Sequence, residues 1–234
     1  MRLDKYLSDM NVGTRAEIKK AVRSGRVTVD GEIAGNPGLS VNETSSVFYM
    51  GKEILYELFS YYMLNKPSGV ITATEDRYQK TVLDLLPDDR RKDLSPVGRL
   101  DKDTEGLLLI TNDGNLNHRL LAPRHHVDKR YYARIQGQVD SRDVRAFADG
   151  IRLDDGLCCM PAHLEILKSG ETSEIEVVIQ EGKFHQIKRM FEAVGKKVIY
   201  LKRLSMGSLV LDPALSPGEW RRLTEDEIKA LKSE

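Results

Sequence analysis

The chain contains 234 residues, of which 40% are hydrophobic and 31% are charged. This length fits one or two compact domains but not three, and the composition argues against disordered, collagen-like and membrane-embedded classes of protein. No apolar run approaches the roughly 20 residues of a membrane-spanning helix, and Asp4, Lys5 and Asp9 interrupt any signal peptide at the N-terminus. We therefore expect a cytoplasmic protein that does not associate with membranes.

Positive charge is concentrated in two stretches, although 36 basic and 36 acidic residues cancel over the whole chain. Residues 2–26 contain seven basic side chains against three acidic ones, and residues 183–203 contain seven against one. Two such stretches could neutralise the backbone phosphates of one nucleic acid. The charges alone leave open the alternative that each stretch is a solvated basic surface. The candidate RNA contacts in the first stretch are Arg2, Lys5, Arg15, Lys19, Arg23 and Arg26.

The N-terminal part of the chain has the pattern of a small unit with two helices and a hairpin. Apolar residues at helical spacing predict a first helix, and Thr14 with Glu17 forms the capping box of a second. An Asp-Gly turn between residues 27–29 and 32–34 predicts a hairpin, and residues 46–50 have the β-branched and aromatic content of a further strand.

The regular pattern of predicted helices and strands becomes weaker around residue 58. We place a domain boundary there, which separates residues 1–58 from residues 59–234. In the larger domain, strand-like and helical patterns are mixed irregularly, which predicts an α+β fold around a mixed, mostly antiparallel sheet. The predicted strands are 61–65, 70–74, 107–111, 129–136, 162–168, 174–180, 197–201 and 207–211. The predicted helices are 81–86, 115–121, 141–149, 185–194 and 224–232.

The densest polar segment is residues 98–106, directly before an apolar run. The sequence has no glycine-rich nucleotide loop, helical histidine pair or nucleophile-elbow serine, so nucleotide hydrolysis and hydride transfer are not expected. Asp101, Asp103 and Glu105 could begin a calcium loop, but Asn112 at the twelfth position cannot supply the closing carboxylate. They could bind magnesium in a nuclease, or form an acidic turn before a strand, and the residues alone leave these alternatives open.

Four segments resemble the motifs of the pseudouridine synthase family, in the family's order. Residues 98–109 resemble its central motif, in which the aspartate after Arg-Leu is catalytic. Residues 66–69, Lys-Pro-Ser-Gly, resemble its Lys-Pro-x-Gly segment, and the surroundings of Tyr131 resemble the segment with the active-site tyrosine. Residues 182–190 resemble its last motif, whose basic residue pairs with the aspartate.

The N-terminal unit resembles the S-four RNA-binding domain, through Arg-Leu-Asp-Lys at residues 2–5 and the glycine-bounded segment 25–31. This pairing of domains resembles the branch of the family whose founding member modifies small-subunit ribosomal RNA. Residues 123–126, Pro-Arg-His-His, are similar to that member. The resemblance implies an enzyme that isomerises a uridine of ribosomal RNA, most closely of the small subunit.

The resemblance also implies roles for individual side chains. Asp101 would begin the reaction, either by attacking the anomeric carbon of the ribose or by taking a proton from the adjacent sugar carbon. Lys188 would pair with it, with Arg189 as the alternative. Tyr131 would lie against the uracil ring, with Tyr132 as the alternative, because adjacent residues of a strand face opposite sides.

The target base should leave the RNA stack, at a cost of a few kcal/mol that phosphate contacts offset. Arg99 is the candidate phosphate or pocket contact, and Arg124, His125, Lys183 and Arg189 are further candidates for RNA binding. We expect no metal, no cofactor and a monomer. The alternatives are a synthase acting on large-subunit RNA, a non-catalytic RNA-binding or ribosome-assembly module, and a metal-dependent nuclease.

Overall fold

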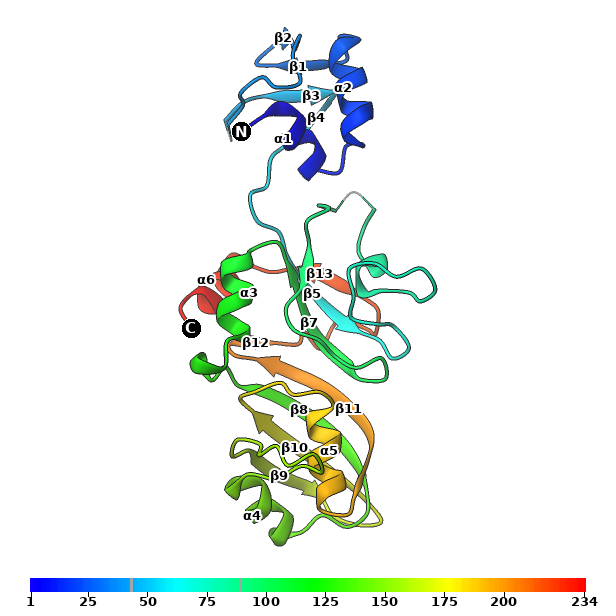
Figure 1. Ribbon diagram of the computed structural model, residues 1–234, viewed down its shortest axis with the longest axis vertical. Helices are drawn as coiled ribbons and strands as arrows, with labels where there is room; N and C mark the ends of the chain where they lie inside the picture. The colour runs from blue at the N-terminus through cyan, green and yellow to red at the C-terminus, as the bar shows by residue number, and fades with distance from the viewer. Residues whose placement is uncertain (43, 89) are drawn as a thin grey trace. The chain divides into compact units, whose positions relative to one another are not determined.

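The computed structural model describes residues 1–42, 44–88 and 90–234 (Figure 1). The chain forms two compact units, Met1–Ser60 with Leu86–Leu94, and Tyr61–Leu85 with Ser95–Glu234. Helices and a mixed sheet confirm the predicted α+β fold class. The second unit is thus interrupted in sequence, because residues 86–94 cluster with the first unit although they lie inside the range 59–234 expected for the larger domain. Among the described residues, no helix has the length and apolar character needed to cross a membrane.

The first unit packs two helices on a small sheet. Thr14 and Glu17 form the predicted capping box, in which each side chain accepts a hydrogen bond from the other's backbone N–H. The helices bury Leu3, Tyr6 and Ile18 against the sheet. The helices are α1 (Leu3–Asp9) and α2 (Arg15–Arg23), and the sheet, in the order β2-β1-β3-β4, consists of β1 (Val27–Val29), β2 (Glu32–Ile33), β3 (Val47–Tyr49) and β4 (Lys52–Glu53).

Arg91 explains why residues 86–94 belong to the first unit. Its side chain is almost fully buried and forms an ion pair with Asp93 at 2.8 Å and a longer one with Asp9 at 3.8 Å. It also donates to the backbone carbonyl of Glu57 and lies over the ring of Tyr56 at 5.2 Å. A buried guanidinium needs several such partners, because each unsatisfied donor would be costly.

The second unit is built on one twisted sheet, in the order β13-β5-β7-β11-β8-β10-β9, with β6 and β12 paired beside it. Among the strand pairs of the described residues, β7 and β11 run parallel and the others antiparallel, which confirms the expected mixed sheet. The strands are β5 (Tyr61–Lys66), β6 (Ser95–Pro96), β7 (Glu105–Thr111), β8 (Lys129–Gln136), β9 (His163–Lys168), β10 (Thr172–Ile179), β11 (Lys197–Met206), β12 (Leu209–Val210) and β13 (Trp220–Arg222).

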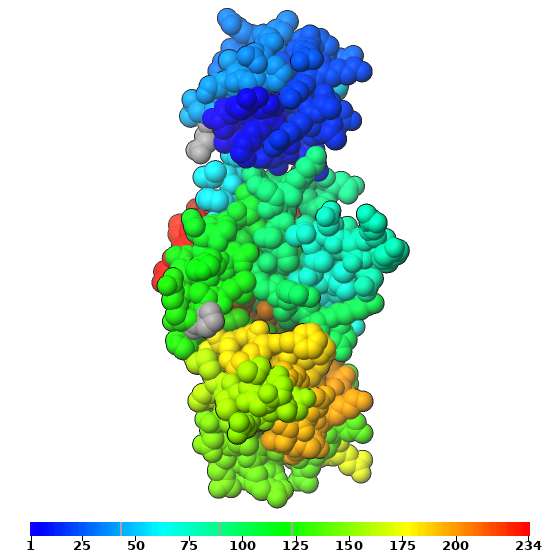
Figure 2. Space-filling view, in the orientation of Figure 1, coloured from blue at the N-terminus to red at the C-terminus, as the bar shows by residue number. Residues whose placement is uncertain are grey.

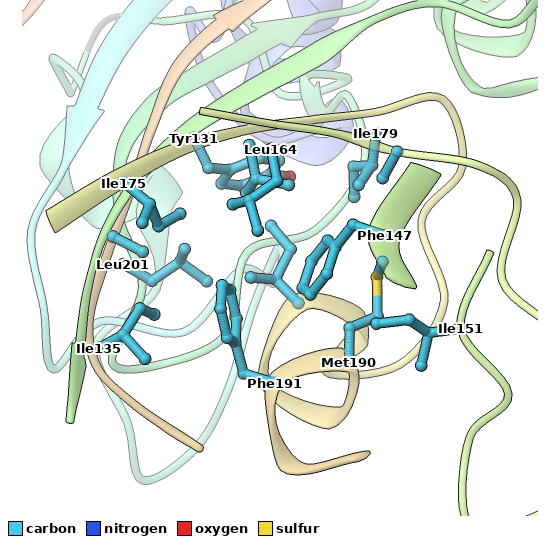
Figure 3. Close-up of a cluster of buried hydrophobic side chains, with 14 of the residues drawn as sticks. Tyr131, Ile135, Phe147, Ile151, Leu164, Ile175, Ile179, Met190, Phe191 and Leu201 are labelled. Carbon is cyan, nitrogen blue, oxygen red and sulfur yellow. The ribbon is translucent and has the colours of Figure 1, made fainter. Parts of the chain in front are cut away.

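Four α-helices and two short 3₁₀ helices accompany this sheet in the described part of the chain. Helices α4 and α5 pack together, since the rings of Phe147 and Phe191 lie 4.8 Å apart, and they cover the buried residues Ile135, Ile175 and Leu201 of the sheet (Figure 3). The helices are α3 (Gly114–Leu121), α4 (Ser141–Asp149), α5 (Gln186–Ala193) and α6 (Glu225–Lys232), with 3₁₀ turns at Val82–Leu85 and Pro123–His125. In Figure 2, the yellow-orange α5 and the orange β11 lie side by side, in agreement with their contacts.

Two expected elements of the second unit differ from the observed ones. The strand predicted at residues 70–74 is reduced to an isolated bridge between Ile71 and Thr81. The side chain of Thr72 donates to the carbonyl of Leu100 at 2.7 Å and accepts from its N–H at 3.2 Å, so this segment is tied to the loop before β7. The helix predicted at residues 81–86 is a single 3₁₀ turn.

Gly106 allows the parallel strands β7 and β11 to meet. Its φ is +98°, and a Cβ atom built on it would lie 2.3 Å from the carbonyl oxygen of Arg203 and 2.8 Å from its backbone nitrogen. Real Cβ atoms do not approach backbone this closely, and backbone within a sheet cannot easily move away.

We expect Gly106→Ala to lower the free energy of unfolding by more than about 3 kcal/mol, because both backbone strain and a clash oppose the added methyl group. Gly156→Ala is the matched control, since Gly156 has a φ of +84° but no atom within 4 Å of the position that the new methyl group would take. It should lose only about 1–2 kcal/mol. Urea denaturation measures both, and equal losses would show that the clash with Arg203 is unimportant.

Candidate active site

Asp101 and Lys188 lie together, although 87 positions separate them in the sequence. Asp101 belongs to the loop before β7, and Lys188 to the first turn of α5. The Nζ atom of Lys188 lies 3.0 Å from Oδ2 of Asp101, and both side chains are largely buried, 19% and 25% exposed. Such a pair holds a carboxylate next to a fixed positive charge at the edge of the protein interior.

Lys188 also binds Asp103, at 2.6 Å, on its more exposed side. Burial opposes the positive charge of Lys188, but hydrogen bonds to Asp103 and Asp101 outweigh it and raise the pKa of the ammonium group. Lys188 therefore remains positive throughout the neutral range. Burial of Asp103 is likewise outweighed by its hydrogen bond to Lys188, which lowers the pKa of Asp103.

The third carboxylate of the segment has a different partner. Glu105, the first residue of β7, accepts a hydrogen bond from the hydroxyl of Tyr200 at 2.8 Å. Asp101 and Asp103 share Lys188 instead, and the described residues contain no cluster of three side chains arranged to hold a metal ion. The alternation in the sequence therefore does not bring the three carboxylates to one point, as a calcium loop or a nuclease site would require.

Lys66 supports the loop that carries Asp101, a role that its place in a sequence motif did not indicate. This last residue of β5 is fully buried, and its ammonium group donates to the carbonyls of Asp101 at 3.0 Å and Thr104 at 2.8 Å. It also donates to the carbonyls of Pro67 at 3.1 Å and Lys102 at 3.3 Å. The loop is therefore wrapped around a buried positive charge, which fixes its backbone.

A small pocket of about 70 Å³ opens beside Asp101, several times the roughly 10–15 Å³ that one water molecule needs. All of its walls belong to the second unit: the loop before β7, the turn before α5 with the first residues of that helix, and one residue each of β8, β10 and β11. The pocket is lined by Arg99, Leu100, Asp101, Thr104, Tyr131, Ile179, Gly182, Lys183, His185, Gln186, Ile187, Lys188 and Leu201.

Tyr131, and not Tyr132, faces this pocket. Tyr131 lies on the buried face of β8 and belongs to the cluster of Figure 3, and no described residue hydrogen-bonds to its hydroxyl. Tyr132 lies on the opposite face, where its hydroxyl donates to Glu174 at 2.7 Å. Thr104, which was not predicted from the sequence as a site residue, also lines the pocket, and its buried hydroxyl has no partner among the described residues.

Three further side chains of the motif at residues 182–190 differ in their positions relative to the pocket. His185 lies with Nε2 at 3.5 Å from Oδ1 of Asp101. Lys183 lines the pocket, and its ammonium group binds Glu181 and the carbonyl of Cys158. Arg189 points elsewhere and pairs with Asp154 at 2.5 Å and Asp155 at 2.6 Å, so the cation beside Asp101 is Lys188.

The remaining candidate residues of the second unit are exposed. Arg99 lines the pocket and forms no ion pair with any described residue. Arg124 and His125 lie in the 3₁₀ turn Pro123–His125, outside the residues that line the pocket, with the Nε atoms of their side chains 3.3 Å apart.

In the first unit, the basic residues fall into paired and unpaired groups. Arg2 binds Asp4 at 2.8 Å and Lys5 binds Asp9 at 2.5 Å. The unpaired group is exposed, lies on or directly after α2, and has no ion-pair partner within the described ranges. It consists of Arg15, Lys19, Lys20, Arg23 and Arg26. Lys19 and Arg23 line one shallow groove and Arg26 another.

Comparison with known proteins identifies the class to which this fold and site belong. Residues 60–193 match the family described as RNA pseudouridylate synthase, and residues 1–47 match the S4 domain. The chain belongs to the RNA pseudouridylate synthase family, which confirms the predicted family and enzyme class.

Individual relatives match over almost the whole chain. The chain is 48% identical to the RNA pseudouridine synthase YtzG of Bacillus subtilis strain 168, covering 99% of this chain and 98% of the relative. It is 39% identical to ribosomal small subunit pseudouridine synthase A of Escherichia coli strain K12, covering 99% and 100%. A crystal structure of a pseudouridylate synthase is 36% identical, with a TM-score of 0.69 and coverage of 99% of both chains.

The environment of Lys66 predicts a pH dependence of stability. Burial lowers the pKa of Lys66 from its ordinary value of 10.5 to about 8, so between these pH values the unfolded chain binds more protons than the folded protein. The free energy of unfolding should therefore rise with pH in this window through Lys66. We expect the stability difference between the wild type and Lys66→Met to widen by about 2 kcal/mol from pH 7.5 to 10. Denaturant titrations at both pH values test this, and a constant difference would contradict the lowered pKa.

Proposed function

We propose that this enzyme converts a uridine of small-subunit ribosomal RNA to pseudouridine, with Asp101 as the residue that begins the reaction. The observation that carries the proposal is the Asp101 carboxylate, 3.0 Å from the Lys188 ammonium group in a pocket that Tyr131 also lines. The choice of RNA is supported by relatives named ribosomal small subunit pseudouridine synthase A, 41% identical in Vibrio cholerae and 39% in Escherichia coli.

The proposed reaction is an isomerisation, and its atoms balance without a metal, an oxidant or an energy source. The bond between uracil N1 and ribose C1′ breaks, the base rotates, and a bond forms between uracil C5 and C1′. The proton on C5 then leaves to solvent, while N1 gains one. Asp101 either attacks C1′ and forms a transient ester, or removes a proton from C2′ and returns it, and the proposal includes both routes.

Lys188 and Lys66 would serve Asp101 in different ways. Lys188 is the positive neighbour of the carboxylate, 3.0 Å away, and would hold it by an ion pair at the reacting atoms. Lys66 contacts the loop backbone and not the Asp101 side chain, so it would act as a positioning residue. Its four carbonyl contacts restrict the direction in which Asp101 leaves the loop.

Tyr131 and Thr104 are the groups that would meet the uracil ring. Tyr131 presents an aromatic surface to the pocket, and its hydroxyl has no hydrogen-bond partner among the described side chains and backbone. The hydroxyl could therefore relay the proton from C5 to solvent, giving up its own proton as it accepts the one from C5. The buried hydroxyl of Thr104, similarly unpartnered within the described ranges, could bind a carbonyl oxygen or N–H group of the base.

The uracil of a structured RNA can reach this pocket only after it leaves the stack, at a cost of a few kcal/mol. Exposed cations would offset this cost through phosphate contacts: Arg99 at the pocket, and the unpaired basic residues of α2 in the S4 unit. We propose a monomer that acts on ribosomal RNA or an assembly intermediate, and therefore in the cytoplasm.

Tritium release from RNA labelled at uracil C5 tests the reaction directly. We expect wild-type protein to release tritium from small-subunit ribosomal RNA, and Asp101→Asn to be slower by at least about 10⁴-fold, because the amide can neither attack C1′ nor accept a proton. Asp103→Asn is the matched control. It changes the other carboxylate on Lys188 but should reduce the rate by less than about tenfold.

Each other result has a distinct meaning. Equal activity of Asp101→Asn and wild type would remove Asp101 from the mechanism. Release only from large-subunit RNA would keep the reaction but overturn the substrate. Binding of RNA by wild type without any release, including from assembly intermediates, would favour a non-catalytic module, and RNA cleavage that stops with excess chelator would favour the nuclease.

The two tyrosines provide a second test within one strand. Tyr131→Phe should lower the rate of pseudouridine formation by about 10²-fold or more, because it removes a proton acceptor from the pocket. Tyr132→Phe removes only the hydrogen bond to Glu174 on the other face and should remain within about twofold of wild type. Single-turnover tritium release compares the two, and the reverse order of effects would place Tyr132 in the site.

A further inference from the structure

Phe184 is largely exposed to solvent, although its side chain is apolar. Its relative exposure is 75%, although burial of a phenylalanine contributes roughly 1.5–3 kcal/mol elsewhere in a protein. The ring is nevertheless held in place, because it stacks on the imidazole of His185 with centroids 3.8 Å apart and planes inclined by 19°. One face of Phe184 is thus covered by His185, while most of the side chain remains open.

The turn that presents Phe184 is firmly held. The buried side chain of Gln186 accepts a hydrogen bond from the backbone N–H of Lys183 at 2.9 Å and donates to Glu181 at 2.7 Å. His185 has a φ of 48°, in the left-handed region that a residue with a side chain adopts only at a cost of about 1 kcal/mol or more. The fold maintains this strained conformation, which places the stacked pair at the start of α5.

The stacked pair adjoins the pocket and its charged groups. Both sequence neighbours of Phe184, Lys183 and His185, line the pocket, and His185 lies 3.5 Å from Asp101. Arg99 and Lys188 add further positive charge to the lining. An exposed aromatic ring among cations suits a ligand that combines phosphates with flat rings, which is the chemistry of single-stranded RNA.

We infer that the open face of Phe184 stacks on the base of a nucleotide next to the target uridine. When the target uridine enters the pocket, the base next to it in the RNA loses a stacking partner. Phe184 would replace that partner, so that the flanking base, Phe184 and His185 form one continuous stack. Phe184 is therefore a substrate-binding residue that promotes the flipped-out state of the RNA. This inference rests on the proposed RNA substrate, but it needs binding only and not completed chemistry.

A fluorescence titration tests stacking without turnover. The chain has one tryptophan, Trp220, so Phe184→Trp in a Trp220→Phe background places a single reporter in the turn. Transcribed small-subunit ribosomal RNA should quench its emission, whereas polyphosphate, which has charge but no bases, should not. Leu167→Trp in the same background is the matched control, because Leu167 is an exposed apolar residue of β9 and should show no quenching.

The titration has clear contrary outcomes. Absence of quenching by RNA, or equal quenching by polyphosphate, overturns the inference. Quenching by RNA combined with wild-type protein that releases no tritium would support the stacking role while contradicting the proposed function.

Kinetics of the single variants supply an independent measurement. Phe184→Leu keeps an apolar side chain but lacks a flat ring, and we expect kcat/KM for tritium release to fall about tenfold, mainly through KM. Phe184→Tyr keeps the ring and should stay within about twofold, as should the control Leu167→Ala. If leucine and tyrosine at this position behave alike, Phe184 contributes apolar bulk and not stacking, and the inference fails.

Discussion

The site depends on the buried ammonium group of Lys66. Backbone carbonyl oxygens repel one another when they converge, and the carbonyls of Asp101 and Thr104 both turn toward the same atom. The Nζ group of Lys66 donates a hydrogen bond to each of them, and β5, all of whose residues are buried, brings this group to the loop. With the backbone held from one side, the Asp101 side chain meets Lys188 of α5 on another. Two lysines from distant parts of the chain, Lys66 and Lys188, thus fix the position of the Asp101 carboxylate.

The parallel contact between β7 and β11 brings the walls of the pocket together. Gly106 follows the loop that carries Asp101, and it pairs with Arg203, two residues after the pocket residue Leu201. Strand β8 pairs antiparallel with β11 and contributes Tyr131 directly opposite Arg203. The absence of a side chain at Gly106 is therefore what allows the loop, Tyr131 and Leu201 to share one pocket. A side chain at this position would collide with the backbone of Arg203 and push β7 and β11 apart.

Local patterns in the sequence predicted local structure well, and long-range contacts poorly. The capping box at Thr14 formed as expected because it needs only its own four residues. The strand expected at residues 70–74 did not form, since Thr72 bonds to Leu100 instead of to a neighbouring strand. The approach of Lys188 to Asp101 was expected only through the family resemblance, and no periodicity indicates it. The roles of Lys66 and Arg91 depend on carbonyls and carboxylates far away in the sequence, which composition and spacing do not reveal.

The placement of residues 86–94 in the first unit has a consequence for the order of synthesis. During synthesis on the ribosome, the residues of α1, α2 and their sheet are made first. Arg91, which contacts Asp9 and the Glu57 carbonyl, is made some thirty residues after the end of the segment Met1–Ser60. By then β5 has already been made, while its neighbour β7 has not. The N-terminal unit is thus complete only when residues 86–94 have been added to it. A fragment that ends at residue 60 would lack the Arg91 guanidinium group, which contacts the Asp9 carboxylate and the Glu57 carbonyl.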